Sequence, residues 1–477
     1  MMGRQHLFQN KLFITAFNLD KRIRKDHPLR RIADHIDFDF IYNEVKGTYG
    51  TNGNVSVAPP VILKIMLLLI LSNVRSEREL MATIPERLDW LWFLGYDIDD
   101  EIPNHSVLSK ARARWGAEVF KRFFERLVWQ CVELGLVDGR KLFMDSSLVQ
   151  ANASNNSVVN RRSLRRYLKK SYQVFESRLE ERSDCHEDDD QKRGDANRKH
   201  VSTTDPDASV TRKGKGKSRL KYQVHRAVDE RCEVITATEL TAGCVNEAHR
   251  LKSLIDSHHR NTGRKAEVCV ADSKYGTMEN YLTCYDLGVK SHFESFEKVH
   301  KGSGRQKGIL PKEAFRYDSR SDTFICPAGE VLKRRRFSRQ RQQFEYTASR
   351  EICKRCHLRN ECTRSQARTL KRHIRQDALD MKLRESESPE AKRDIKTRQH
   401  LMERSFARAV RYGFQRARWR RLWRVSIQEY LTAAIQNIMI LIRYAPMPKD
   451  RLAERVRVTA KKPFGGVLQT VFSYAGF

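Results

Sequence analysis

The chain has 477 residues, with 91 Lys or Arg against 59 Asp or Glu, which gives a formal net charge of +32. Such a charge favours nucleic acid as a partner. The longest apolar run, residues 61–71, contains Lys64 and is shorter than the ~20 residues of a membrane span. No signal-peptide pattern opens the chain, so we expect a cytoplasmic protein whose ten cysteines are reduced thiols or metal ligands.

The first elements are expected to be helical. Residues 1–57 form a basic N-terminal segment with one short helix expected at 34–45. From Pro59, a residue typical of a first helical turn, the pattern stays helical to residue 136. Apolar residues recur there at intervals of three and four, namely at Leu80, Ile84, Leu88 and Leu91. We predict a helical DNA-binding domain over residues 58–138.

A helix is predicted to begin at Ser106, after a turn-like stretch at residues 95–106. Lys110, Arg112 and Arg114 fall in its first turns. A helix that enters the major groove of DNA carries basic side chains in this way. The alternative is a helix whose exposed face is merely charged.

The elements that follow decide the fold class. Residues 141–151 form an expected strand, and a charged insertion occupies 155–219, with a middle (179–200) expected to be disordered or a solvated helix. Two alternating strands follow at 222–229 and 232–240. After them come an amphipathic helix at 246–259 and a buried strand at 267–271.

Two aspartates accompany the first and last of these strands. Asp145 closes the apolar run of the first, and Asp272 follows the last. Three strands, a helix and a fourth strand, with an acid on the first and fourth, is the ribonuclease H-like layout. We therefore expect an α/β fold: a ribonuclease H-like core with a mixed sheet flanked by helices, a helical N-terminal domain and a cysteine-bearing insertion. The alternative is an unrelated sheet in which both aspartates are ordinary strand-end residues.

A cysteine-containing insertion is expected at residues 300–390 of a catalytic domain that spans 139–445. It contains a CxxC pair and two further cysteines: Cys326, Cys353, Cys356 and Cys362. Four thiolates are the ligand count of a tetrahedral zinc site. The basic segment at 333–352 is expected to form a hairpin between the first cysteine and the others. The alternative is four reduced cysteines without metal.

A third acid, Glu403, lies in an Arg-rich helical pattern at residues 398–411. Three carboxylates from two strands and a helix can hold two divalent metals, about 3.5–4 Å apart, for phosphodiester chemistry. The alternative for Glu403 is an intrahelical ion pair. The competing acids are Glu429 first, and then Glu385, Glu387 and Glu390.

Several further residues are candidate DNA contacts beside the acids. Arginine grips phosphate and tryptophan stacks on exposed bases. The candidates are Asn152, Lys274, Tyr275, Arg398, Arg408, Arg411, Arg418 and Trp419. For Trp419 and Trp423, packing on the core is an equal alternative. An apolar-faced helix at 425–445 is expected to pack on the catalytic sheet, and residues 446–477 form a basic tail.

These blocks resemble DDE-type bacterial insertion-sequence transposases. The resemblance rests on MDSSLVQANAS, the segment from TDPDASV to ELTAG, VNEAHRLKSLID and VCVADSKYGTMENYLTCYDLG, and on the helical residues 58–136, and it covers roughly residues 59–445. It implies a catalytic triad of Asp145, Asp272 and Glu403, with Asp145 bridging two Mg²⁺ or Mn²⁺ ions. The chain departs from the family where Ile395 takes a Tyr position, Val410 takes a Lys position, and Ser-Lys-Tyr-Gly at 273–276 replaces a Lys-Gly-Tyr order.

The resemblance implies a DNA transposase that binds the terminal inverted repeats of a mobile element, cuts them by metal-activated water, and joins the freed 3′-OH to target DNA. The implied partners are double-stranded DNA of the element ends and the target, and a second copy of the chain in the synaptic complex. The expected location is the bacterial cytoplasm, with the nucleoid. The alternatives are a ribonuclease H-fold nuclease without joining activity, and an inactive DNA-binding repressor.

Overall fold

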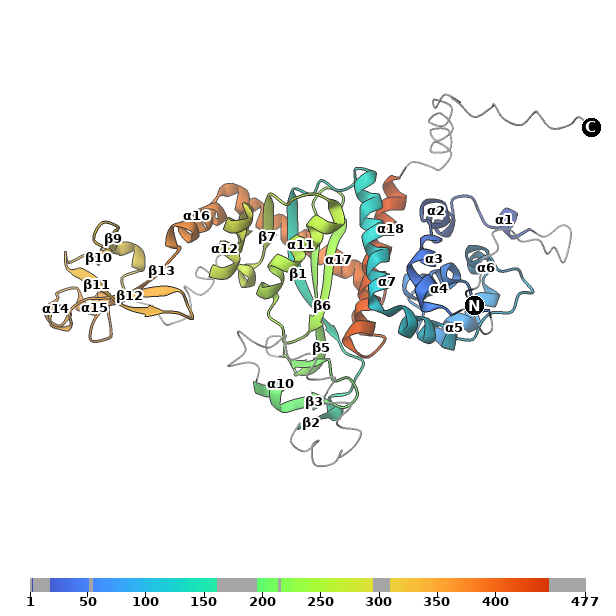
Figure 1. Cartoon of the computed structure of the whole chain (residues 1–477), viewed down its shortest axis with the longest axis horizontal. Helices are drawn as coiled ribbons and strands as arrows, with labels where there is room; N and C mark the ends of the chain where they lie inside the picture. The colour runs from blue at the N-terminus through green and yellow to red at the C-terminus, as the bar shows by residue number, and fades with distance from the viewer. Residues whose placement is uncertain are drawn as a thin grey trace, which may run out of the picture. The chain divides into compact units, whose positions relative to one another are not determined.

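The computed structural model describes residues 18–50, 55–160, 195–212, 216–294 and 309–445, together with Met2. The chain divides into two compact units (Figure 1). The helical unit comprises Met1–Leu136, Ala409–Phe414 and Trp423–Phe477. The sheet unit comprises Val137–Arg408 and Gln415–Leu422.

The helical unit is built around two apolar helices, α4 and α18. Its elements are α1 (Leu19–Arg22), α2 (Pro28–His35), α3 (Phe40–Val45), η1 (Lys46–Thr48), α4 (Pro59–Leu71), α5 (Glu77–Thr83), η2 (Ile84–Glu86), α6 (Leu88–Leu94), α7 (Ser106–Glu133) and most of α18 (Leu422–Tyr444). All of α4 except Lys64 and Leu71 is buried. By length and composition α18 could cross a membrane, with a hydropathy of 1.3 in its most apolar window, but 83% of that window is buried inside the protein. This is the pattern of a core helix.

Residues 18–48 belong to the core of this unit. The single helix expected at 34–45 is instead two helices, α2 and α3, separated at residues 36–39. The break contains an Asx turn, in which the backbone N–H of Asp39 donates to Asp37 Oδ1 at 2.9 Å. Leu29, Ile32 and Ile41 are buried, so the helices pack as core elements of the unit.

Helix α7 begins at Ser106, as the sequence predicts, with Asn104 Oδ1 accepting the backbone N–H of Ser106 at 2.9 Å. It is kinked at Gly116, where φ is 69° and ψ is −175°. A left-handed φ costs glycine little because it has no Cβ. The expected single helix is therefore two helical segments joined at that glycine.

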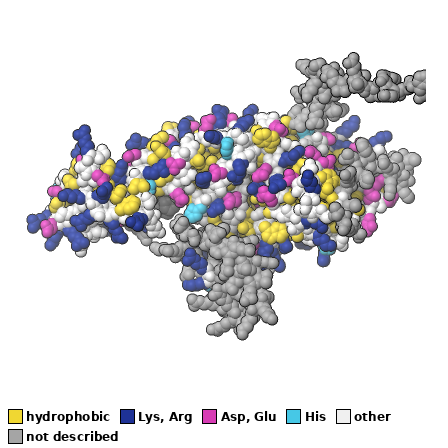
Figure 2. Space-filling view, viewed as in Figure 1, with side chains coloured by type: hydrophobic (Ala, Val, Ile, Leu, Met, Phe, Trp, Pro, Cys, Tyr) yellow, Lys and Arg dark blue, Asp and Glu magenta, His cyan; other side chains and the backbone are white. Residues whose placement is uncertain are grey.

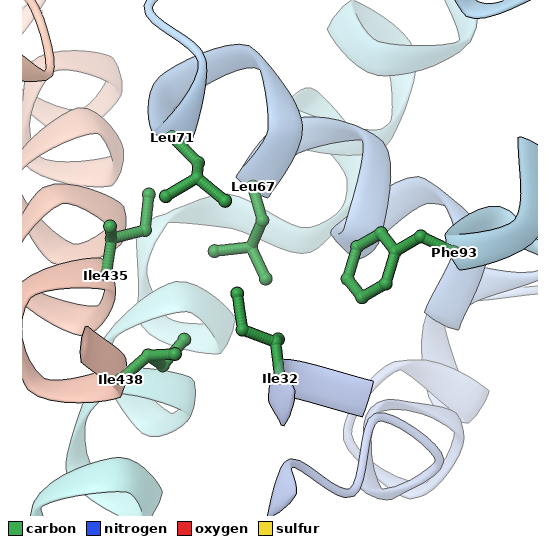
Figure 3. A pocket seen from close by; sticks show the side chains of 6 residues that line it. All are labelled: Ile32, Leu67, Leu71, Phe93, Ile435 and Ile438. Carbon is green, nitrogen blue, oxygen red and sulfur yellow. The ribbon is translucent and has the colours of Figure 1, made fainter. Parts of the chain in front are cut away.

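A small apolar pocket lies inside the helical unit (Figure 3). Its lining comes from α2, α4, α6 and α18 and consists of Ile32, Leu67, Leu71, Phe93, Ile435 and Ile438. With only hydrocarbon and ring carbon lining it, this pocket offers no acid–base or metal chemistry. It is a gap in helix packing.

The sheet unit has a mixed six-stranded sheet with the order β4-β5-β1-β7-β8, in which β6 also pairs with β5. The strands are β1 (Lys141–Gln150), β4 (Ser209–Thr211), β5 (Arg219–Asp229), β6 (Ile235–Ala242), β7 (Val268–Ala271) and β8 (Lys290–Phe293). Strand β1 is central: it pairs antiparallel with β5 and parallel with β7. The expected mixed sheet beside a helical N-terminal region is confirmed. Strand β6 begins three residues later than expected because Glu233, at φ 61°, turns the chain.

Helices cover both faces of the sheet (Figure 1). Leu142 and Met144 of β1 share a buried cluster with Leu254 of α11 (Leu251–Thr262) and Tyr281 of α12 (Met278–Leu287). Successive side chains of a strand point to opposite faces. Lys141 and Asp145 of β1 accordingly meet α17 (Pro389–Arg411) instead, through ion pairs with Asp394 and Arg398. Helix α16 (Gln376–Glu387) packs at the β8 edge, where Ser386 Oγ donates to the carbonyl of Ser291 at 2.6 Å.

A second, five-stranded antiparallel sheet lies between β8 and α16 in the chain, and we call it the insertion sheet. Its order is β13-β12-β11-β10-β9, with β9 (Arg316–Asp318), β10 (Thr323–Ile325), β11 (Val331–Ser338), β12 (Gln343–Thr347) and β13 (Thr369–His373). The expected basic hairpin is β11–β12, which confirms that prediction. Because α16 packs on the main sheet, the insertion sheet ends at His373, earlier than residue 390.

The charged insertion at 155–219 is only partly described. Its described elements are η3 (Asn155–Ser157), β2 (Val158–Asn160), α10 (Asp195–Lys199), β3 (His200–Ser202) and the edge strand β4. Strands β2 and β3 form a two-stranded sheet. Most of the stretch expected to be disordered or a solvated helix, and the basic tail at 446–477, lie outside the described residues.

Candidate active site

Asp145 and Asp272 lie on neighbouring parallel strands. Strand β1 continues to Gln150, so Asp145 lies in the middle of its strand, not at the end as expected. Strand β7 does end at Ala271, directly before Asp272. Phe143 is paired with Val270, and the same register extended by two residues places Asp272 near Asp145, whose carboxylate raises the pKa of Asp272. The pairing of β1 with β7 therefore brings the two aspartates together.

The Asp145 carboxylate is held by a buried arginine of α17. Arg398 Nη1 donates to Asp145 Oδ2 at 2.5 Å, and the backbone N–H of Ser146 donates to Oδ1 at 2.7 Å. Burial raises the pKa of Asp145, while the Arg398 guanidinium opposes that rise. Arg398, which the sequence suggested as a DNA contact, thus also fixes a candidate catalytic carboxylate.

The Asp272 carboxylate has no such side-chain partner among the residues that the structure describes. It accepts the backbone N–H of Lys274 at 3.1 Å. Burial, together with the neighbouring Glu247 and Asp145 carboxylates, raises the pKa of Asp272 to about 6. The Asp272 carboxyl is therefore close to other negatively charged groups, and a bound cation would reduce the repulsion between them.

Glu247 is the functional-site candidate that sequence reasoning missed. It is 3% exposed and lies in the first turn of η5 (Glu247–Arg250). The Ser146 hydroxyl and the Lys274 ammonium both contact its carboxylate, and Gln223 Nε2 approaches it at 3.4 Å. In the sequence, a Glu at a helix start indicates a favourable helix-dipole charge. Only the folded sheet shows that it stands beside the two aspartates.

Glu403 is not brought to the aspartate pair. It is exposed on α17, five residues after Arg398, which places its side chain about 140° further around the helix. Among the described residues, it forms no hydrogen bond or ion pair. The alternative of an intrahelical ion pair for Glu403 is therefore not found there, and the neighbouring Arg404 and Arg408 bind Glu233 instead.

The competing acids have other surroundings. Glu385 pairs with Lys382 of α16 at 2.9 Å, and Glu390 lies 3.9 Å from Lys141. Glu429 is buried in α18, within the helical unit. Throughout the described ranges, no three His, Cys, Asp or Glu side chains are arranged to hold a metal ion. The structure therefore provides an aspartate pair with Glu247 beside it, and no formed three-ligand site.

Two predicted DNA contacts are buried, which corrects their assignment. Arg112 is 5% exposed and pairs with Glu77 at 2.6 Å, so it stabilises the junction of α5 and α7. Tyr275 is fully buried, so its ring cannot stack on a base in this conformation. Lys110 and Arg114 are exposed, with the Arg114 guanidinium 4.5 Å from the centre of the Tyr49 ring.

Other predicted DNA contacts follow β1 and α17. Asn152 holds the chain after α17, since its Nδ2 donates to the Arg418 carbonyl at 2.9 Å while its own carbonyl accepts from Arg420 Nε at 3.1 Å. Arg418 and Trp419 are partly buried, and Arg411 is exposed. Asn152 therefore has a clear positioning role next to the strand that carries Asp145.

The four insertion cysteines share one neighbourhood. Cys326, Cys353 and Cys362 pack against the small core of the insertion sheet. Burial raises the pKa of Cys362, which the thiols of Cys353, Cys326 and Cys356 also raise. Cys326 Sγ accepts the backbone N–H of Glu330 at 3.3 Å. The thiols are thus grouped, although in the described chain they do not have the spacing of a formed metal site.

Two transposase family models match the chain. The model described as Transposase domain (DUF772) matches residues 17–114, and the Transposase DDE domain matches residues 325–442. The chain is a transposase of the DDE class, with this N-terminal transposase domain and a DDE domain, and it acts in DNA transposition. The DDE match contains Glu403 and Arg398, and the two aspartates precede it.

Comparisons with solved structures and with curated proteins add no evidence about function. A solved piggyBac transposase synaptic complex with hairpin DNA is similar at 10% identity and a TM-score of 0.29, over 93% of this chain and 87% of that one. A similarity of that size supports no further argument. No curated protein matches the sequence.

Proposed function

We propose that this transposase binds the terminal inverted repeats of its element and cuts and joins DNA strands with two divalent metal ions at the Asp145–Asp272 pair. The single observation that supports this site is the pairing of β1 with β7, which brings the two aspartates together. In this proposal the mixed sheet is a ribonuclease H-like core, since a central strand carries one acid and its parallel neighbour is followed by the other.

The donor set fits a hard divalent cation. DDE transposases generally use divalent metal ions, and Mg²⁺ is usually held by one or two carboxylates, waters and substrate phosphates. Asp145 and Asp272 supply such carboxylates without any further protein ligand. Glu403 remains the proposed third carboxylate, on the same helix as Arg398 and with no partner among the described residues. Bound metals would activate the attacking water or 3′-OH and stabilise the leaving oxygen.

The protein's own residues would orient the reaction. Arg398 fixes Asp145 from α17, and Lys274 follows Asp272 directly. The Lys274 side chain is exposed and would be available to an incoming phosphodiester, and charge-assisted contacts to phosphate fix register without reading sequence.

Basic surface on the insertion sheet supports DNA binding. Residues 309–375 contain 18 Lys or Arg against seven Asp or Glu. Figure 2 shows Lys and Arg side chains crowded over this part of the sheet unit. Several point outward from β11, where Lys333, Arg334, Arg335 and Arg336 are exposed. We propose that this surface contacts the phosphate backbone of element-end or target DNA, and that two copies of the chain act together on two ends.

A strand-transfer assay tests the proposed function. Purified full-length protein is incubated with Mg²⁺, a supercoiled plasmid, and short duplexes that carry the element's terminal repeats with free 3′-OH ends. Joined products support the transposase proposal. Cleavage of uncut ends without joining would favour a nuclease, and end binding without either reaction would favour a repressor.

We also propose that the four insertion cysteines hold a structural Zn²⁺. The insertion sheet has a core of only six buried hydrophobic residues, and a domain of this size is usually stabilised by a disulfide or a metal. Its thiols are reduced and grouped around Cys362. The backbone N–H that Cys326 accepts would also stabilise a thiolate.

A further inference from the structure

We propose that Glu247 is a further carboxylate of the metal site, and that Lys274 is a tethered counter-ion that a divalent cation displaces. In this arrangement the Lys274 ammonium neutralises Glu247 when no metal is bound. Once a cation enters between the carboxylates, the ammonium is free to contact a DNA phosphate. The inference rests on the proposed function, because it assigns additional residues to the same site.

Hydrogen bonds attach Glu247 of η5 to strand β1 of the sheet. Its carboxylate receives the Ser146 hydroxyl, from the residue next to Asp145, and the Ser146 oxygen in turn accepts Gln223 Nε2 at 2.7 Å. Asn280 Nδ2 donates at 3.0 Å to the carbonyls of both Ala248 and Tyr275. Asn280 therefore ties the start of η5 to the segment that follows Asp272, and so keeps Glu247 near both aspartates.

A buried hydroxyl gives independent evidence that this pocket receives a ligand. Tyr275 is fully buried, and its hydroxyl oxygen has no hydrogen-bond partner in the described structure. The charges that raise its pKa come from Glu247, Asp145 and Asp272, with Arg398 opposing them, so the hydroxyl lies near the three carboxylates. A buried hydroxyl without a partner is costly, and a water or other oxygen ligand in the pocket would satisfy it.

The charges in the pocket are incompletely balanced. Asp145 has Arg398 and Glu247 has Lys274, whereas within the described part of the chain Asp272 accepts a backbone N–H and no side-chain donor. Three carboxylates thus face two cationic side chains, which leaves room for additional positive charge.

The two cations differ in their freedom to move. The Arg398 side chain is 8% exposed, whereas that of Lys274 is 64% exposed. A lysine ammonium on a flexible stem can leave an ion pair and remain hydrated. Lys274 is therefore the cation that exchanges with a metal, and Arg398 is the one that stays.

A purely structural Glu247–Lys274 ion pair makes different predictions for metal binding. If the pair only stabilises the fold, removing Lys274 weakens the protein and leaves its affinity for metal unchanged. If Lys274 competes with the metal, its removal strengthens metal binding. Whether the affinity for metal rises or stays unchanged when Lys274 is substituted therefore distinguishes the two roles.

The test measures Mn²⁺ binding to the full-length protein without DNA, by titration with detection of free Mn²⁺ by electron paramagnetic resonance. We expect Lys274→Met to bind Mn²⁺ about tenfold more tightly than the native chain, and Glu247→Gln about tenfold more weakly. Lys274→Met should also show a larger Mn²⁺-induced rise in Tm, because binding to the folded state stabilises it. The matched control is Lys252→Met, which breaks the exposed Lys252–Asp256 pair on α11 and should change nothing.

Asp145→Asn separates this inference from the proposed function. If Asp145→Asn abolishes Mn²⁺ binding while Lys274→Met and Glu247→Gln stay within twofold of the native affinity, the inference is wrong and the metal site stands. If Asp145→Asn also binds Mn²⁺ like the native chain, the proposed metal site itself is wrong. Should Glu247→Gln fail to fold, Lys274→Met decides alone, and an unchanged or weaker affinity overturns the inference.

Discussion

Asp145 lies on β1, and Asp272 directly follows the adjacent parallel strand β7, so the two carboxylates are neighbours although 126 residues separate them in the chain. Arg398 and Lys274 are the only basic side chains among the charged groups that bear most strongly on Asp272. Asp272→Asn removes a charge that has no side-chain ion pair among the described residues, so the fold should tolerate it. Asp145→Asn deprives the buried Arg398 of its charged partner and should lower stability.

Asp145→Asn and Asp272→Asn should each lower strand cleavage and joining by at least about a thousandfold, because each removes a carboxylate that the proposed metals need. Binding to element ends should stay within about threefold. Cleavage is measured on end-labelled duplexes and binding by mobility shift at fixed salt, since affinity for DNA depends on salt. Near-native cleavage by either variant would remove that aspartate from the active site.

Glu403→Gln should reduce cleavage as strongly as the aspartate variants while leaving Tm within about 1 °C, because Glu403 is exposed and has no described partner to lose. Its matched control is Glu233→Gln, which breaks the ion pairs with Arg404 and Arg408 near the same helix. If Glu403→Gln cleaves normally and Glu247→Gln does not, Glu247 is the third catalytic carboxylate.

The metal-free protein should lose stability as the pH rises from about 4 to 6, because burial and the neighbouring carboxylates raise the pKa of Asp272 to about 6 from 3.8. Between these values the folded protein binds a proton that the unfolded chain releases, so unfolding becomes easier as the pH rises. Asp272→Asn removes this penalty and should stabilise the metal-free protein by ~1–3 kcal/mol above pH 6.

Urea unfolding at pH 4.5 and 7.5, with chelator present, measures the difference. The advantage of Asp272→Asn should be larger at pH 7.5 than at pH 4.5. An equal advantage at both pH values would mean that the Asp272 carboxyl does not carry the shift.

Zinc should be present at about one ion per chain in protein purified without chelator, and its removal should destabilise the insertion sheet. Cys353→Ser with Cys356→Ser should lose the zinc and increase proteolysis within residues 309–375. Cys232→Ser is the control, since Cys232 lies in the sheet unit outside the cluster. Metal analysis that finds no zinc, with the same proteolysis in all three proteins, would contradict the site.

Arg112→Ala should destabilise the protein by ~3–5 kcal/mol, because it breaks the poorly exposed Arg112–Glu77 ion pair and removes a buried side chain. Arg114→Ala should leave stability within about 0.5 kcal/mol, since its guanidinium is exposed and only lies over Tyr49. If the start of α7 contacts DNA, Arg114→Ala should weaken end binding and make the dependence of affinity on salt less steep. Denaturation curves and salt-series mobility shifts measure the two effects separately.

Sequence patterns were sufficient for the main sheet because its strands alternate or form buried runs. The run that closes at Asp145 and the run before Asp272 predicted neighbouring strands, and the β1–β7 register confirms their adjacency. The strand expected at residues 141–151 is β1 (Lys141–Gln150), but the apolar run that closes at Asp145 wrongly suggested that this aspartate lies at a strand end.

The rest of the site depends on tertiary contacts without a local signature. Glu247 is an ordinary helix-start residue until η5 packs against β1 and the segment after Asp272. The sequence predicted Arg112 and Tyr275 to be exposed DNA contacts, because a charged side chain and a hydroxyl group usually face solvent. Folding buries both residues. For Glu403 the difficulty is different. The resemblance to DDE transposases pointed to this residue, but the sequence could not show in which direction its side chain points from α17.

Helix α17 is the last element of the chain to reach the main sheet along its length, through Asp394, Arg398 and Ser405. On the ribosome, Asp145 and Asp272 emerge long before the arginine that anchors the first of them. Nascent or prematurely terminated products therefore carry both aspartates without the helix that completes their surroundings. In such products Asp145 lacks the Arg398 contact that fixes its carboxylate.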